Sequence, residues 1–206
     1  HSFSYADPSK NNLIVKGSVG IGTPTPAVKL TVQTGSSILT GYGIEHNAAA
    51  VALAASDPRV YAAVGVHPHD AAQLDDAGRT AVRGWLAAPR VVAVGECGLD
   101  YWYEHSPRAI QRDVFAWHVA LARERQRPVV VHVRDRGADA YEELLGIWAS
   151  EGRGEVEGVL HCYTHDLAFA ERALEQRLWI SFSGILTFKR DRGLRAGSVL
   201  AFGEDH

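Results

Sequence analysis

Five short, unbroken apolar runs recur through the middle of the chain, and segments with helical character precede or separate them. The runs are residues 60–66, 91–94, 129–131, 158–160 and 178–182, and helices are predicted at 48–55, 74–87, 107–126, 138–150 and 167–176. Apolar runs without polar alternation are typical of strands buried on both faces of a parallel sheet. Strands that alternate with helices indicate right-handed β–α–β units. The pattern predicts an α/β fold, either an open doubly wound sheet or a closed (β/α) barrel. Within it, Ser106 is expected as the N-cap of the helix that begins at Pro107.

The pattern divides the chain into three zones. Residues 1–36 form a β-rich segment in which residues 28–32 alternate apolar with polar, as in a half-buried strand. The wording of residues 17–32 resembles short β-repeats of phage and bacterial fibre proteins. Residues 37–189 carry the β/α pattern, and residues 190–206 are expected to be a loose tail.

Length and charge limit the possible functions. The chain has 206 residues, whereas a complete eight-stranded barrel typically has about 250. The formal net charge of −3 provides no overall positive field for nucleic acid, so such a substrate has to be held by local contacts or by a metal. No apolar run approaches the ~20 residues that span a bilayer, so no membrane association is predicted. Cys97 and Cys162 lie in apolar runs, which favours reduced thiols and a cytoplasmic protein.

Chemically active side chains stand at the carboxyl ends of four successive predicted strands. His67, Glu96, His132 and His161 each come at or just after an apolar run. In a parallel barrel these ends converge on one face, where active sites are built. Imidazole and carboxylate are the ligands expected for zinc, manganese or a similar divalent ion. The sequence therefore predicts a metal site that activates water for hydrolysis.

Each candidate residue is weighed against a purely structural role. A single histidine at a strand end is more often structural than a ligand, but four strand ends in succession argue against coincidence. Glu96 is the strongest candidate, since burying a carboxylate is costly unless it is paired or bound to metal. Cys97 is expected to point away from the cleft as a buried thiol. His105 and His118 are expected at the surface or in helix packing, while Trp102 could line a substrate cleft.

Four motifs carry a resemblance to a known family. They are residues 61–69 (YAAVGVHPH), 95–101 (GECGLDY), 132–135 (HVRD) and 160–163 (LHCY). In this order and spacing the chain resembles the TatD family of metal-dependent hydrolases over residues 38–188. The resemblance implies a TIM-type barrel, a divalent-metal site (zinc, magnesium or manganese) and hydrolysis of ester bonds, with DNA or a small phosphodiester as substrate.

The resemblance also implies roles for individual residues. Glu96, His132 and His161 would be the metal ligands and the catalytic residues, with Glu96 placed to bridge two metals. Of the expected substrate-binding residues, His67 would lie near the substrate phosphate, and Arg134 and Asp100 would either contact the metal ligands or lie on the phosphate side. No protein partner is indicated.

The chain departs from the family at both ends. The family opens with a strand that ends in a His-x-His pair and closes with one that ends in Thr-Asp-Ser-Pro or similar, and neither motif is found here. We therefore expect a truncated or chimeric barrel that lacks the first and last strands. At most one well-formed metal site is expected, and activity reduced by truncation.

Two alternatives remain from the sequence. In the first, the chain is an inactive fragment or chimera whose N-terminal part is a structural or oligomerisation element. In the second, it is another barrel metallohydrolase that acts on a lactone or an amide.

Overall fold

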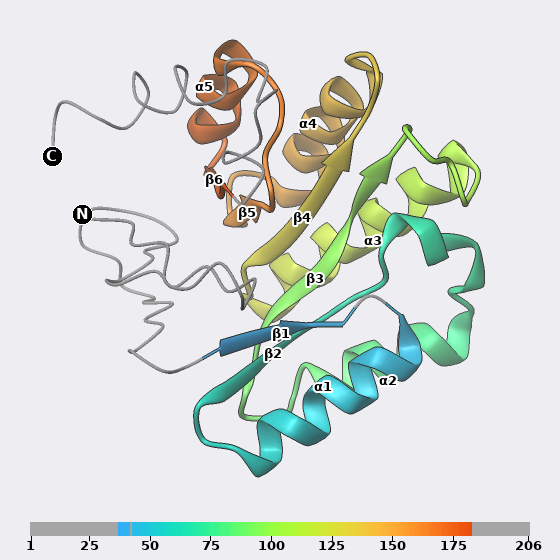
Figure 1. Cartoon of the computed structure of the whole chain (residues 1–206), viewed down its shortest axis with the longest axis vertical. Coiled ribbons are helices and arrows are strands. Elements are labelled where there is room, and N and C mark those ends of the chain that lie inside the picture. Colours follow the sequence, from blue (N-terminus) through green and yellow to red (C-terminus); the bar gives the residue numbers. More distant parts are fainter. Residues whose placement is uncertain (1–36, 42, 183–206) are drawn as a thin grey trace, which may run out of the picture.

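The computed structural model describes residues 37–41 and 43–182. The predicted strand at 28–32 and the tail at 190–206 lie outside the described residues. The helices and strands alternate along the chain (Figure 1). They are β1 (Ser37–Thr40), α1 (Ile44–Ser56), β2 (Val60–Val64), the 3-10 helix η1 (Pro68–Gln73), α2 (Asp76–Trp85), β3 (Val91–Asp100), α3 (Arg108–Arg125), β4 (Val129–Arg134), α4 (Asp139–Gly152), β5 (Gly158–Leu160), α5 (Leu167–Glu175) and β6 (Leu178–Ile180).

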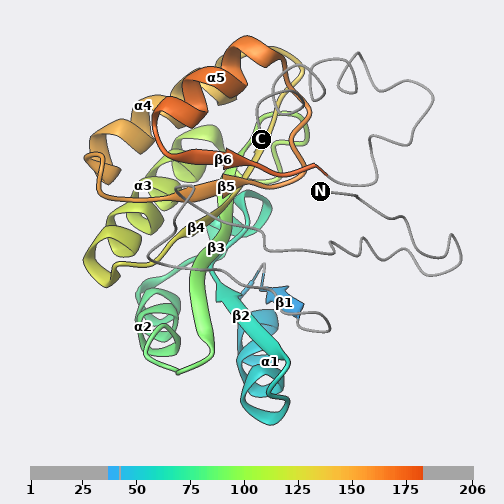
Figure 2. The same cartoon turned by 90° about the vertical axis from the view of Figure 1, so that its left-hand side faces the viewer.

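The strands form one parallel sheet in which neighbours in sequence are neighbours in space. The order is β1-β2-β3-β4-β5-β6, and every pairing is parallel. Figures 1 and 2 show the α-helices on the same side of a curved sheet. A doubly wound sheet would have helices on both faces and a reversal of strand order. The α/β prediction is therefore confirmed in its barrel form, and the six described strands make an incomplete barrel, since a complete one has eight.

Strand β1 was not predicted from the sequence. Ser37–Thr40 is only four residues long and carries polar residues at both ends, so it lacks the apolar signature of the other strands. It pairs with β2 from Ser37↔Val60 to Thr40↔Ala63. Its position depends on this pairing, which local sequence does not encode.

Strand β3 extends beyond its predicted end at residue 94 and continues to Asp100. Two glycines permit this extension because β3 and β4 approach each other closely at these points. Gly95 and Gly98 have φ values of 132° and 148°, a region that disfavours residues with a side chain. A Cβ on Gly98 would lie 1.8 Å from the carbonyl oxygen of His132. Glu96 consequently lies within the strand instead of following it.

The start of helix α3 differs from the prediction. The helix begins at Arg108, Pro107 occupies the N-cap position, and no side chain caps it. The predicted cap, Ser106, instead donates its hydroxyl to the carbonyl of His69 at 2.8 Å and accepts from the amide of Ala72 at 3.1 Å. The serine thus ties the start of α3 to η1, a tertiary contact that competes with capping.

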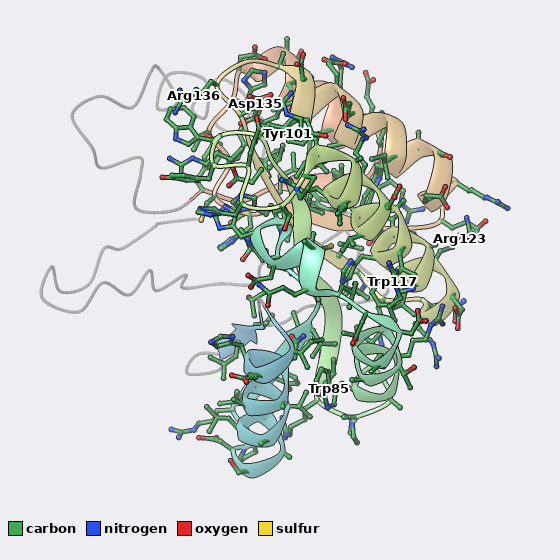
Figure 3. The ribbon with its side chains drawn as sticks, turned by 90° about the vertical axis from the view of Figure 1, so that its right-hand side faces the viewer. Trp85, Tyr101, Trp117, Arg123, Asp135 and Arg136 are labelled. Carbon is green, nitrogen blue, oxygen red and sulfur yellow. The ribbon has the colours of Figure 1, made fainter. Side chains whose placement is uncertain are left out.

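The core lies between the sheet and the helices. Val64, Val94, Val131 and Leu160, from four successive strands, are fully buried. Burying each such side chain contributes about 1.5–3 kcal/mol. On the helix-covered side shown in Figure 3, the guanidinium of Arg79 on α2 lies 4.8 Å from the ring centre of Trp117 on α3. Among the described helices, none has both the length and the apolar character needed to cross a bilayer.

Candidate metal centre

Four side chains from the carboxyl ends of β2 to β5 meet on one face of the sheet. His67 follows β2, Glu96 lies in β3, His132 lies in β4, and His161 directly follows β5. Oε1 of Glu96 lies 3.4 Å from Nδ1 of His132 and 3.2 Å from Nδ1 of His161. The parallel strand order thus places one carboxylate oxygen between two imidazoles.

His67 lies on the other side of this group. Its ring centre is 4.4 Å from that of His132. One potential ligand atom from each of His67, Glu96 and His132 lies within 4.8 Å of the other two. The donors of His67, Glu96 and His132 therefore form one compact set, and Glu96 and His161 form a close pair beside it. Both combine the nitrogen and oxygen donors that zinc and manganese accept.

His132 has a carboxylate at each ring nitrogen. Its Nε2 lies 3.0 Å from Oδ2 of Asp100, while its Nδ1 faces Glu96. Histidines that bind metals commonly use the second ring nitrogen to donate to a carboxylate, which fixes the tautomer and the ring orientation. The surroundings of His132 have this arrangement.

Interactions within the group stabilise the carboxylates in their ionised form and two of the histidines in their protonated form. Burial opposes ionisation of Glu96, but hydrogen bonds with His132 and His161 outweigh it and hold the pKa of Glu96 below its usual range. Burial also opposes protonation of His132, yet Asp100 and Glu96 raise its pKa. The metal-free cluster therefore holds protons on nitrogen that a cation would displace.

The pKa values of His67 and His161 shift in opposite directions. Burial, with the neighbouring His132 adding to it, lowers the pKa of His67 to about 4, so its imidazole is neutral at pH 7. Contacts with Cys162 and then with Glu96 raise the pKa of His161 to about 10. Its Nε2 lies 3.3 Å from the sulfur of Cys162.

Asp100 connects the histidines to the surrounding backbone. Its side chain is 1% exposed, and its Oδ2 also lies 2.9 Å from Nε2 of His69. Its Oδ1 accepts from the amides of Trp102 at 3.0 Å and Tyr103 at 2.9 Å. Asp100, expected either in contact with the metal ligands or on the phosphate side, is thus buried and contacts His132.

Two residues of this network were not assigned a role from the sequence. His69 shares Asp100 with His132, and the spacing of His67-Pro68-His69 could have indicated it. Gln111 is fully buried on α3 and accepts from the amide of Asp100 at 2.7 Å. A glutamine in a helix carries no local signal for such a contact.

Arg134 lies apart from the cluster, at the exposed end of β4. Its guanidinium carbon is 5.2 Å from the ring centre of Trp102 and 5.1 Å from that of Tyr103. Trp102, expected to line a cleft, therefore lies in an arginine–aromatic group beside the metal centre.

The remaining candidates take structural positions. Cys97 is fully buried, and burial raises the pKa of its thiol. His118 is buried inside α3, where Nε2 accepts from the amide of Val66 at 3.1 Å and Nδ1 donates to the carbonyl of Val114 at 2.8 Å. His105 is exposed, with its ring centre 4.5 Å from that of His69.

The chain is similar in sequence to known proteins. The family model of TatD-related DNases matches residues 25–198. The "uncharacterized metal-dependent hydrolase YabD" of Bacillus subtilis is 38% identical over 130 residues, which cover 63% of this chain and 49% of that protein. The "3'-5' ssDNA/RNA exonuclease TatD" of Salmonella typhimurium is 33% identical over 165 residues, which cover 80% and 62% of the two chains.

Solved structures agree with the fold. The crystal structure of YJJV, a TatD homolog from Escherichia coli K12, superposes with a TM-score of 0.72 at 26% identity, over 81% of this chain and 63% of that one. A TatD family hydrolase from Entamoeba histolytica gives a TM-score of 0.63 at 19% identity, over 73% and 52%.

The match to the family model extends over most of the sequence, although the chain spans about half the length of several curated relatives. The chain therefore belongs to the family of TatD-related DNases.

Proposed function

We propose that this chain is a divalent-metal-dependent hydrolase that cleaves phosphodiester bonds, with Glu96, His132 and His161 as the metal ligands. The observation that carries the proposal is the position of one Glu96 oxygen, within 3.4 Å of Nδ1 of His132 and 3.2 Å of Nδ1 of His161. Two imidazole donors this close to one carboxylate oxygen favour a shared ion.

The donor set fits a zinc, magnesium or manganese ion. Its nitrogen donors favour zinc and its carboxylate also suits magnesium or manganese, and the relatives include proteins named as metal-dependent hydrolases. Asp100 would hold the Nε2 proton of His132, so that Nδ1 presents its lone pair to the ion. Within the described residues, one group of three donors lies close enough to hold an ion, His67, Glu96 and His132, and it shares two residues with the proposed set, which supports one ion per chain.

The protein residues have separable tasks in the reaction. When bound, a divalent cation supplies Lewis-acid chemistry by lowering the pKa of water and offsetting charge on a phosphate. Glu96 would orient the water through its carboxylate, and His161, 44% exposed, would face the solvent from which the water comes. Neutral His67 would lie beside the phosphate as a hydrogen-bond partner, and its position within reach of Glu96 and His132 makes it the alternative third ligand.

We propose a nucleic acid strand as the substrate, because several relatives are named as exonucleases of single-stranded DNA and RNA. A cytoplasmic location is part of the same proposal. It is supported by the absence of a disulfide between Cys97 and Cys162, the two cysteines of the chain.

The experiment combines metal binding with hydrolysis. Isothermal titration with zinc and manganese is compared with cleavage of methyl p-nitrophenyl phosphate by the wild type and by Glu96→Gln. We expect one site per chain, and a loss of both binding and cleavage in the variant. Glu142→Gln removes a carboxylate at the surface of α4, paired with Arg172, and is the matched control.

Two outcomes would contradict the proposal. Cleavage of a lactone or an amide without cleavage of the phosphodiester would favour the other barrel hydrolase. Zinc affinity unchanged in Glu96→Gln would remove the metal assignment.

A further inference from the structure

An arginine–aromatic group lies beside the metal centre, on the loops that follow β3 and β4. It consists of Trp102, Tyr103, Arg134 and Arg136, and we call it the aromatic platform. We propose that the aromatic platform binds a single-stranded nucleic acid, with a base stacked on Trp102 and the phosphates held by the two arginines. The inference rests on the proposed function and adds to it the surface that binds the strand.

The aromatic platform combines two neighbouring rings with two guanidinium groups that lie over the ring of Trp102. The guanidinium carbons of Arg134 and Arg136 lie 5.2 Å and 4.9 Å from the ring centre of Trp102. Tyr103 is 51% exposed, and its ring centre lies 6.5 Å from that of Trp102. Exposed aromatic rings bind bases without sequence preference, and arginines pair with the phosphates between them.

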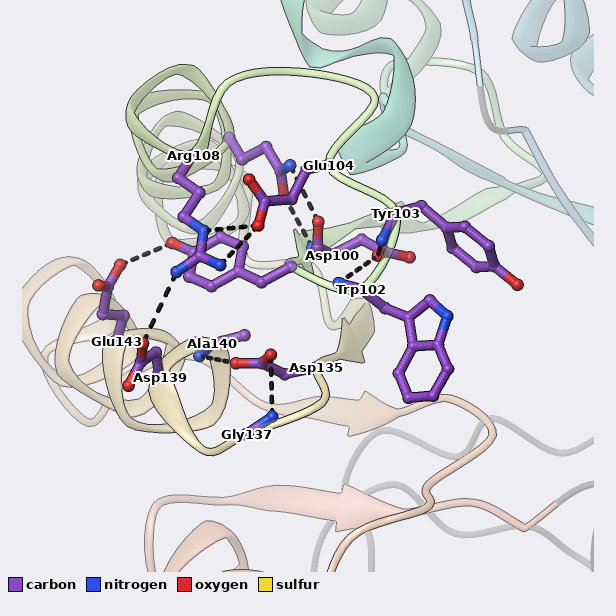
Figure 4. Close-up of polar contacts among 12 residues, drawn as sticks. Asp100, Trp102, Tyr103, Glu104, Arg108, Asp135, Gly137, Asp139, Ala140 and Glu143 are labelled. Carbon is purple, nitrogen blue, oxygen red and sulfur yellow. Dashed lines mark hydrogen bonds and ion pairs between the residues drawn. The ribbon is translucent and has the colours of Figure 1, made fainter.

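The carboxylates of Asp100 and Asp135 hold the two loops in place. Asp100 accepts from the backbone amides of Trp102 and Tyr103, and Figure 4 shows these two side chains pointing away from helices α3 and α4. Asp135 accepts from the amides of Gly137 at 3.1 Å and Ala140 at 3.0 Å, which ties the second loop to the start of α4. The rings and arginines are therefore presented on a rigid support.

The positive charges of Arg134 and Arg136 are available to pair with a ligand. Asp135, which lies between them in sequence, turns its carboxylate to backbone amides. Within the described part of the chain, neither Arg134 nor Arg136 forms an ion pair. Because the net charge of the whole chain is −3, attraction of a polyanion depends on such a local group.

The aromatic platform is continuous with the proposed metal centre. The ring centre of Tyr103 lies 5.6 Å from that of His69, and His69 shares Asp100 with His132. A strand whose scissile phosphate lies at the metal centre would therefore pass directly onto these rings. Tyr103 is exposed and Trp102 is half-buried, and neither ring belongs to the hydrophobic core.

The test is fluorescence anisotropy in EDTA, so that binding is measured without metal or cleavage. The probes are a fluorescein-labelled oligothymidylate of about eight nucleotides and an abasic strand of the same length. We expect the wild type to bind the oligothymidylate more tightly than the abasic strand. Trp102→Ala should lose about 10-fold in affinity for the oligothymidylate and little for the abasic strand. Trp102→Phe, which keeps a ring, should restore the preference.

Arginine variants separate charge from stacking. Arg134→Ala should weaken binding of both strands and reduce the slope of log affinity against log salt by about 0.7. Arg90→Ala is the matched control, because Arg90 lies 5.2 Å from the ring centre of Tyr61 at the opposite ends of the strands. It should bind both probes as the wild type does.

Failure of this inference is distinguishable from failure of the proposed function. Equal wild-type affinity for both strands, no binding at all, or unchanged affinity in a folded Trp102→Ala would overturn the aromatic platform. Methyl p-nitrophenyl phosphate has no base that could stack, so the wild type should cleave it whether or not the aromatic platform binds a strand. Its cleavage therefore reports on the metal centre alone.

Discussion

His132 and the buried Asp100 form a close pair in which Nε2 of the imidazole lies 3.0 Å from Oδ2 of the carboxylate. The pair joins β4 to β3 and leaves Nδ1 of His132 facing Glu96. Asp100 lies only four residues beyond Glu96 in the same strand, so β3 supplies both the proposed ligand and the group that orients its partner.

The first prediction concerns this pair. Asp100→Asn removes the negative charge that holds the Nε2 proton of His132, and we expect zinc affinity to fall about 10–100-fold. Isothermal titration measures the change. Asp139→Asn, at a carboxylate that is 76% exposed on α4, is the control and should bind zinc like the wild type. Equal affinities of the two variants would mean that Asp100 does not orient a ligand.

The second prediction separates the two outer histidines. His161→Ala should weaken zinc binding, because it removes a proposed ligand 3.2 Å from Glu96. His67→Ala should retain zinc affinity but hydrolyse methyl p-nitrophenyl phosphate more slowly, because His67 is proposed to contact the phosphate. Titration and kinetics on the same samples decide between the two ligand sets. Loss of zinc affinity in His67→Ala alone would assign His67, and not His161, as the third ligand.

The third prediction concerns stability against pH and uses His118. Burial lowers the pKa of this histidine from 6.5 to about 4, so the unfolded chain binds a proton at higher pH than the folded chain does. The stabilising contribution of neutral His118 is therefore complete above about pH 6.5 and is lost as the pH falls through 4. The full change is on the order of 3 kcal/mol.

Urea unfolding at several pH values, with and without His118→Gln, isolates this contribution. The variant should be less stable at pH 7, since the amide of Val66 and the carbonyl of Val114 lose their partner in the wild-type geometry. Its stability should also depend less on pH between 6.5 and 4. Parallel stability curves for the two proteins would exclude His118 as a source of the pH dependence.

The fourth prediction concerns the close approach of β3 and β4. Gly98→Ala should destabilise the protein by several kcal/mol, because its Cβ would lie 1.8 Å from the carbonyl oxygen of His132 and φ is +148°. Gly84→Ala, in α2 with no atom within 4 Å of the added Cβ, should instead stabilise by about 0.5–1 kcal/mol. Thermal unfolding measures both. A neutral Gly98→Ala would show that the strands separate there without cost.

Local sequence patterns were sufficient for most of the elements and for the chemistry at the strand ends. Unbroken apolar runs identified β2 to β6, since burial on both faces leaves no polar alternation. His67, Glu96, His132 and His161 could be grouped in advance, because parallel strands present their carboxyl ends on one face. Their roles as ligands stay predictions, whereas their proximity is a property of the fold.

Only the tertiary structure decided the contacts that depend on register and on loop conformation. Strand β1 exists through its pairing with β2, and Ser106 prefers His69 and Ala72 to its own helix. One oxygen of Asp100 contacts both His69 and His132, and two arginines lie over Trp102. These contacts join residues about 30 positions apart. Hydrophobic periodicity reports which face of an element is buried, but it contains no information on which polar group meets which across two elements.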